Sequence, residues 1–217
     1  MPHKIFEIDE VLRVIVWHTR DISETTTVSL ACCCKSFEEP ALSLLWVSKP
    51  LNDLAALFPS ILTRAPTEEE GNRFRQYASW IRVLSVDLAP GYVTQELTLL
   101  LDLIASHYTK RATTVFPNLC KLTWHGEPSS LTYFPSFVSP ILTDLRAHIT
   151  TRWETRHLPG EYAPLEFVMN SIISPSTLRS LCLDVPPEAN PSPEFKQGVA
   201  DLTSANRSGS VALGAIL

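Results

Sequence analysis

Apolar side chains near the N-terminus recur at helical spacing, and polar breaks divide them into three segments. The first segment has an apolar stripe and a second apolar side formed by Val14, Val16 and Trp17. Ser23 and residues 25–27 suit helix caps, so we expect a turn there and a second helix over residues 28–34. A third helix should have Pro40 near its first turn and Trp46 at its end. A helix that is apolar on two sides must be covered on two sides, so this segment predicts packing beyond its own interior. The stripe of the first helix comprises Ile8, Val11, Leu12 and Ile15.

A second pattern recurs downstream: an apolar residue, two others, an apolar residue, one other, and a third apolar residue. Between the first two copies, Thr94 can cap a helix with an apolar stripe, and another stripe follows Pro164. Strands joined by crossover helices form parallel sheets, so the fold class predicted is α+β to α/β. The copies begin at Ile81, Leu119, Leu142 and Leu178. The two stripes are Leu97, Leu100, Leu101, Ile104 and Tyr108, and Leu165, Val168, Met169 and Ile172.

These patterns divide the chain into four parts. Residues 1–50 form the helical module, and residues 51–78 form a helix and a charged linker. The linker prediction rests on residues 64–75, where three glutamates are offset by three arginines, as in a solvated connector. Residues 79–185 hold the repeats. Residues 186–217 are rich in proline, serine and glycine, so we expect a largely disordered tail and an uncovered sheet edge at the fourth strand.

Composition narrows the classes of partner. The chain has 217 residues, 45% of them hydrophobic, which is enough for a real core. Its 18 basic and 23 acidic residues give a net charge of -5, and the longest basic run is Lys110 and Arg111, so we expect no nucleic-acid partner. Apolar runs are far shorter than the roughly 18 residues that a membrane span needs. We therefore expect no membrane association, and a cytoplasmic and/or nuclear protein.

Catalytic signatures are missing from the sequence. All seven glycines are isolated, which excludes a phosphate loop and a dinucleotide fingerprint, and no nucleophile motif occurs. We therefore expect that the protein is not an enzyme and binds no cofactor. The five cysteines lack paired zinc spacing, so we predict reduced thiols and no metal site. His148 and His157 with Glu154 and Glu161 match no known ligand spacing, and we interpret them as solvated loop residues.

Two residues of the second region are candidates for a substrate surface. Trp153 lies in a polar stretch, where a tryptophan is more exposed than in an apolar pattern. His125 stands at the end of a predicted strand, where sites of α/β proteins gather.

The N-terminal segment resembles an F-box of the fungal type, on residues 8–12, 30–37 and 39–46. The downstream pattern resembles leucine-rich repeats, whose second and third apolar positions point into a shared core. Together the resemblances imply a small three-helix F-box followed by a short, irregular solenoid with a parallel sheet. They also imply a substrate-recognition adaptor that docks on a Skp-type adaptor of a cullin-RING ubiquitin ligase and holds a target protein through the repeats. Residue matching assigns the docking surface to Ile8, Val11, Leu12, Cys34, Phe37 and Trp46.

One position departs from the F-box pattern. Asp9 replaces the usual proline, which either weakens docking or caps the first helix. Two alternatives therefore stay open. In the first, the protein is a repeat scaffold without a ligase, and Val11, Leu12 and Phe37 are buried within the chain. In the second, it is an α/β enzyme with a concave polar site at His125.

Overall fold

The computed structural model describes residues 9–89, 91–111, 114–150, 178–184, 197 and 210–214. The chain divides into two compact units, Met1–Ser48 and Lys49–Leu217, whereas we expected the first module to end at residue 50. The predicted helical stripe after Pro164 lies outside the described residues, as do Trp153, His157, Glu154 and Glu161.

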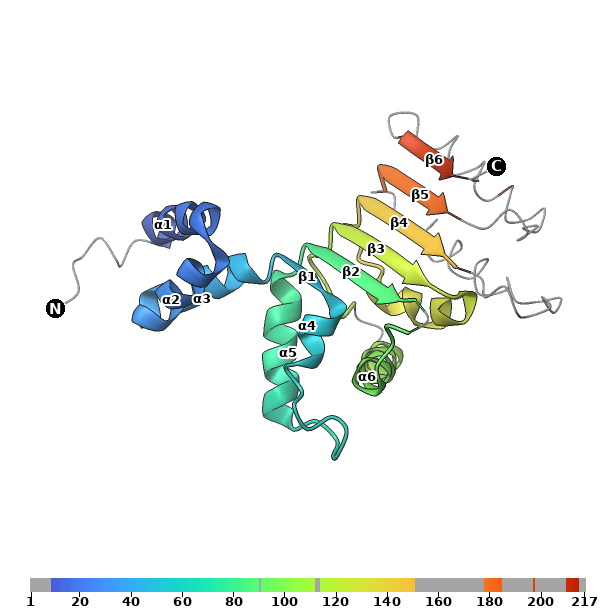
Figure 1. The fold of residues 1–217 in the computed structure, drawn as a ribbon, viewed down its shortest axis with the longest axis horizontal. Coiled ribbons are helices and arrows are strands. Elements are labelled where there is room, and N and C mark those ends of the chain that lie inside the picture. The colour runs from blue at the N-terminus through green and yellow to red at the C-terminus, as the bar shows by residue number, and fades with distance from the viewer. Residues whose placement is uncertain are drawn as a thin grey trace. The chain divides into compact units, whose positions relative to one another are not determined.

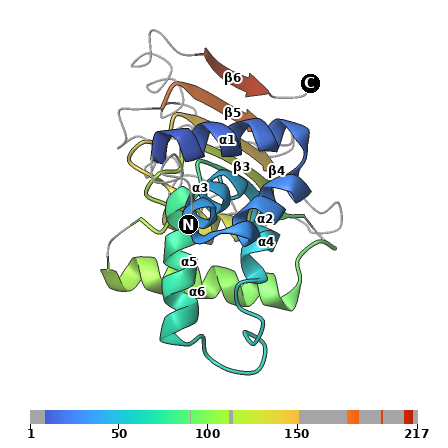
Figure 2. The same cartoon turned by 90° about the vertical axis from the view of Figure 1, so that its left-hand side faces the viewer.

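The first unit contains three helices, α1 (Asp9–Ile22), α2 (Glu24–Cys33) and α3 (Lys35–Leu45), which are labelled in Figure 2. Helix α2 begins earlier than expected because Ser23 is its N-cap, and the Ser23 Oγ accepts a hydrogen bond from the Thr26 N–H at 3.0 Å. Helix α3 likewise begins before the predicted point, at Lys35. Pro40 consequently lies inside α3 and not in its first turn.

The second unit is built on a six-stranded sheet with the strand order β1-β2-β3-β4-β5-β6. Strands β2 to β6 pair in parallel, and their arrows point the same way in Figure 1. Helices and a parallel sheet together make a mixed α/β architecture, which confirms the predicted class at that level. The strands are β1 (Ser48–Pro50), β2 (Val83–Leu88), β3 (Lys121–Gly126), β4 (Asp144–Ile149), β5 (Ser180–Asp184) and β6 (Ser210–Gly214).

The recurring apolar pattern places one leucine of each copy in a single row across the sheet. The register pairs Leu84 with Leu122, Leu122 with Leu145, and Leu145 with Leu181, and all four are buried. A backbone motif repeats at the starts of β3, β4 and β5, where one carbonyl of the preceding copy accepts two successive N–H groups; the Cys120 carbonyl, for example, accepts those of residues 143 and 144. Four separate stretches of sequence therefore adopt the same local geometry.

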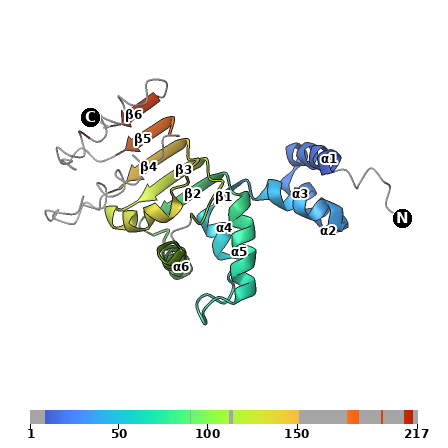
Figure 3. The same ribbon diagram turned by 180° about the vertical axis from the view of Figure 1, so that it is seen from behind.

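Helices cover the apolar side of this sheet. Helix α4 (Leu51–Ala55), α5 (Glu68–Trp80) and α6 (Gln95–Arg111) lie on one side of the sheet in Figure 1 and, from behind, in Figure 3. Thr94 caps α6 as predicted, since its Oγ1 accepts the Leu97 N–H at 3.2 Å. The predicted stripe of α6 is buried at Leu97, Leu100, Leu101 and Ile104.

A 3-10 helix, η2 (Pro128–Phe137), connects β3 to β4 and was not predicted. Its buried residues Leu131, Phe134 and Phe137 lie three apart, which suits a helix with three residues per turn. Phe134 and Phe137 make edge-on contacts with Trp124, at centroid distances of 5.5 and 5.4 Å. The buried aromatic core of the second unit therefore includes this connection as well as the strands.

The predicted charged linker is wrong from Glu68 onward, because these residues form helix α5. The charged side chains of α5 occupy its exposed face, while Phe74 and Ala78, four residues apart, are buried on the other face. Phe74 packs against Phe58 and Phe116, with ring centroids 5.4 and 6.2 Å apart. The charged residues form the solvent-facing side of an amphipathic helix. The two apolar residues Phe74 and Ala78 form the side that packs against the rest of the unit.

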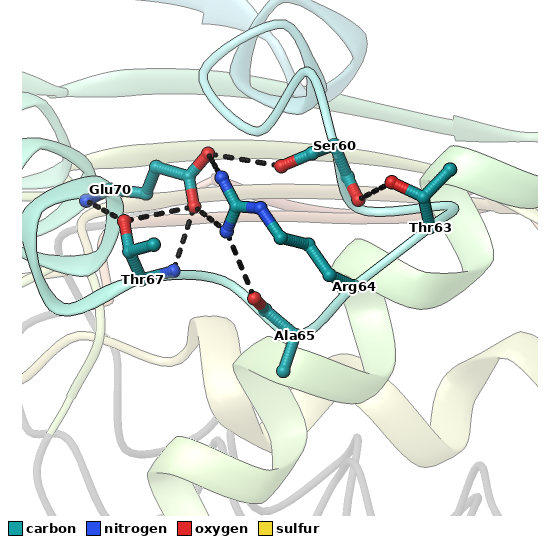
Figure 4. Close-up of polar contacts among 6 residues, drawn as sticks. All are labelled: Ser60, Thr63, Arg64, Ala65, Thr67 and Glu70. Carbon is teal, nitrogen blue, oxygen red and sulfur yellow. Dashed lines mark hydrogen bonds and ion pairs between the residues drawn. The ribbon is translucent and has the colours of Figure 1, made fainter.

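The start of α5 is held by Glu70 (Figure 4). Thr67 and Glu70 form a capping box, and Arg64 donates to both Glu70 carboxylate oxygens, at 2.9 and 3.0 Å. These hydrogen bonds from Arg64, aided by the Thr67 N–H, lower the pKa of Glu70 from 4.5 to about 2. The carboxylate therefore stays charged through most of the acidic range.

The predicted tail also requires correction, because β6 pairs in parallel with β5 and Val211 stands opposite Leu181. The sheet does not end at its fourth repeat strand. The pattern missed β6 because Ser208 occupies the place where the other copies have isoleucine or leucine. One polar substitution was enough to hide a short strand within a proline- and serine-rich stretch.

Leu122→Ala should lower the free energy of unfolding by about 2 to 5 kcal/mol, because it leaves a cavity in the central leucine row. Leu181→Ala should have a similar effect. Urea denaturation measures both. Thr123→Ala is the matched control on the same strand, since Thr123 is exposed and its loss should cost less than about 0.5 kcal/mol. An unchanged midpoint for Leu122→Ala would mean that β3 is wrongly assigned.

Glu70→Gln should reduce stability in a pH-dependent way. The folded-state pKa of Glu70 is depressed, so its charged form stabilises the protein above pH 4.5 and that contribution is lost as the pH falls toward about 2. The difference in melting temperature between wild type and Glu70→Gln should therefore shrink over this range. Glu68→Gln, an exposed neighbour on the same turn, is the control. A pH-independent difference would contradict the Arg64–Glu70 interaction.

Candidate interaction surfaces

The core of the helical unit consists of Leu12, Val16, Phe37 and Ala41, with half-buried residues such as Ile15 and Leu44 packed against it. Leu12 is 5% exposed and Phe37 8% exposed. Both side chains, which residue matching assigned to the docking surface, therefore lie in the interior of the helical unit. Helical spacing places Leu12 and Val16 on the same inward face, so the bundle interior takes Leu12 from the predicted stripe and Val16 from the predicted second side of α1.

The apolar side chains that face solvent are different ones. Val14 and Trp17 are each 57% exposed and lie three residues apart on α1, hence on one helical face. Val28 of α2 is 47% exposed. An exposed tryptophan next to an exposed valine on one helical face forms a small apolar patch, and large aromatic side chains dominate the binding energy of many protein interfaces.

The other residues assigned to docking have mixed positions. Val11, Cys34 and Trp46 are half-buried, and Ile8 lies outside the described residues. Cys34 occupies the N-cap position of α3, and hydrogen bonding to Ser36 lowers the pKa of its thiol. Trp46 occupies the C-cap position, where its N–H bonds to the Leu42 carbonyl at 3.0 Å. Cys34 and Trp46 thus occupy the two ends of α3 and remain partly accessible to solvent.

A hollow of about 580 Å³ opens at the junction of α2 and α3. Its walls include the exposed thiol residues Cys32 and Cys33, and Lys35, Glu38 and Leu42 of α3. The hollow combines apolar and charged atoms, and it is built entirely from the helical unit.

The outward face of the sheet is polar. Side chains alternate along β2 to β4, so the residues between the buried positions, such as Ser85, Thr123 and Arg146, are exposed. The parallel register aligns these residues in rows just as it aligns the buried leucines. One row near the carboxyl ends of four strands contains Asp87, His125, His148 and Asp184.

Each histidine in this row pairs with the aspartate on its outer side. His125 Nδ1 lies 3.2 Å from Asp87 Oδ1, and His148 Nδ1 contacts Asp184 Oδ2. The two imidazole rings are neighbours, with centroids 4.7 Å apart. The side chains of His125 and His148 are 35% and 49% exposed, so solutes can reach them.

One cleft of the second unit does not include His125 among its lining residues. It has a volume of about 690 Å³ and lies among α5, α6 and residues 114–117, lined by apolar side chains such as Phe58, Phe74 and Ile104. His125 instead occupies a partly exposed position on the outward sheet face.

Sequence reasoning missed three of the residues that now stand out. Trp17 was recognised as part of a second apolar side, but the family resemblance directed attention to the inward stripe. Asp87 and Asp184 were not singled out, although each lies three residues after the second apolar position of its copy, as do His125 and His148. Counting the same offset in every copy would have found the row.

Comparisons with known proteins returned no relatives. No family model matches the chain, and neither a curated protein nor a solved structure matches it. Within the described residues, no helix has both the length and the apolar character needed to cross a membrane. The same part of the chain holds no group of three or more His, Cys, Asp or Glu side chains arranged to bind a metal ion.

Leu12→Ala should destabilise the helical unit by about 2 to 5 kcal/mol, because its side chain fills the bundle core. Trp17→Ala should change the free energy of unfolding by less than about 0.5 kcal/mol, because Trp17 is exposed. Thermal unfolding followed by circular dichroism compares the two variants. Equal destabilisation would contradict the division of α1 into a core face and a solvent face.

Proposed function

We propose that the protein is a non-catalytic substrate-recognition subunit of a Skp-cullin-F-box type ubiquitin ligase. The observation that carries the proposal is the exposed pair Val14 and Trp17 on a separate three-helix unit. This unit fills its own core with Leu12, Val16 and Phe37 and still exposes large apolar side chains. An apolar surface of this kind is typical of a docking site for another protein.

The proposal changes the residues expected to contact the Skp-type adaptor. Val14, Trp17 and Val28 replace Leu12 and Phe37, whose role is to keep the helices together. Val11, Cys34 and Trp46 remain candidates because they are half-buried. Asp9, which replaces the usual proline, is the first residue of α1.

The second unit would hold the target protein. Its repeated strands expose a polar face on which rows of side chains are aligned across β2 to β5. A rigid sheet with a variable outer surface suits recognition because the buried leucines can stay constant while the exposed positions change. The assignment of the buried leucines to the core and of the exposed residues to target binding is what the resemblance of the four copies to leucine-rich repeats implies.

A second candidate is a repeat scaffold without ligase association. Burial of Leu12 and Phe37 inside the helical unit favours it, because these residues then need no partner. The two candidates differ on Trp17, which a scaffold has no reason to expose. Association with the Skp-type adaptor decides between them.

Trp17→Asp should weaken binding of the full-length chain to a Skp-type adaptor by about 2 kcal/mol or more, roughly thirtyfold in affinity, because it places a charge at the centre of an apolar interface. Co-purification and a quantitative binding assay measure the loss. Leu12→Asp is unsuitable, since it would unfold the bundle.

Thr123→Asp is the matched control, because it adds the same charge to the outward face of the sheet in the other unit. It should leave adaptor binding intact. Failure of the wild type to bind under conditions that retain a known F-box protein would refute the ligase proposal and favour the scaffold.

A further inference from the structure

The row of Asp87, His125, His148 and Asp184 carries an inference that is independent of the ligase proposal. Parallel pairing places these four side chains at equivalent positions of four neighbouring strands. All four are at least partly exposed on the outward face, so they contribute little to the core. Packing of the core therefore does not explain why two histidines and two aspartates occupy this row.

One carboxylate orients one imidazole. An ionised carboxylate only accepts hydrogen bonds, so the hydrogen bond between Asp184 Oδ2 and His148 Nδ1 places a proton on that Nδ1, while Asp87 Oδ1 lies 3.2 Å from His125 Nδ1 as an ion-pair contact. In a neutral ring, the lone pair then lies on Nε2. Asp87 is itself held in place, because its Oδ1 also accepts the Ala89 N–H at 3.1 Å.

A histidine whose Nδ1–H donates to a carboxylate has the orientation typical of metal-binding histidines. Here one such ring, His148, stands beside His125 with centroids 4.7 Å apart. Nitrogen ligands bind transition-metal ions at about 2.0 to 2.1 Å, so two nitrogens on one ion are at most about 4.2 Å apart. Small rotations of two exposed side chains can reach that separation.

We propose that His125 and His148 bind one divalent transition-metal ion of the nickel, copper and zinc class through their Nε2 atoms. Imidazole nitrogen suits these ions better than magnesium or calcium, which prefer oxygen ligands. Asp184 is a positioning residue that fixes the tautomer of His148, and Asp87 places a negative charge beside His125. The protein supplies two ligands at this site, and water completes the coordination, so the ion is exchangeable.

Isothermal titration calorimetry, in which Ni²⁺ is added to the untagged full-length protein, tests this proposal. The wild type should bind one equivalent in a saturable manner, and His125→Gln and His148→Gln should each abolish that binding. Asp184→Ala should weaken it by about 10- to 100-fold, because Asp184 orients a ligand without touching the ion. Asp144→Ala is its matched control, since Asp144 is also on the sheet but bonds to Thr143 at 2.8 Å.

Two further controls separate this site from other metal ligands of the chain. His18→Gln changes an exposed histidine on α1, and Cys32→Ser with Cys33→Ser removes the exposed thiols; both proteins should bind Ni²⁺ like the wild type. Circular dichroism should show that the His125 and His148 variants remain folded. The proposal is overturned if the wild type shows no saturable binding, if the double variant His125→Gln, His148→Gln still binds, or if the cysteine variant loses binding. All these variants should bind the Skp-type adaptor as the wild type does. Loss of metal binding therefore tests the metal site without testing the ligase proposal.

Discussion

In-register parallel pairing of one leucine per copy is the constraint on which the second unit depends. Leu84, Leu122, Leu145 and Leu181 form a continuous buried row, and the helices on that side close over it. Side chains alternate along a strand, so a slip of one residue would turn the row out to solvent and bring polar residues inward. The energetic cost of burying Thr123 or Arg146 in place of Leu122 or Leu145 makes this register unambiguous.

The same constraint determines what the outward face displays. Once the leucines are aligned, every residue at a fixed offset from them is aligned too, whatever its chemical type. Asp87, His125, His148 and Asp184 share one offset and therefore share one row. Their proximity is a consequence of the core, so it requires no special backbone geometry. Next to this row, close packing requires a glycine at position 126, at the end of β3, because a Cβ there would lie 2.7 Å from the Ser130 Oγ.

The sequence predicted those features whose signal was periodic and repeated. The strands β2 to β5 follow from four copies of one pattern, and α6 follows from its stripe and the Thr94 cap. It failed for β6, where Ser208 breaks the pattern, and for α5, where a high density of charge concealed Phe74 and Ala78. It also failed for η2, whose three-residue spacing resembles neither an α-helix nor a strand.

The candidate sites were harder to predict because they depend on which of two apolar faces turns inward. Along α1, hydrophobicity alone does not distinguish Leu12 and Val16 from Val14 and Trp17. The distinction arises from packing: Phe37 and Ala41 of α3 complete a core with the first pair. A three-helix unit this small has room for one such core, so the second apolar face of α1 must remain outside it. The exposure of Trp17 is therefore a direct consequence of how α1 and α3 pack, and this exposed aromatic side chain is the strongest physical reason to look for a binding partner at this surface.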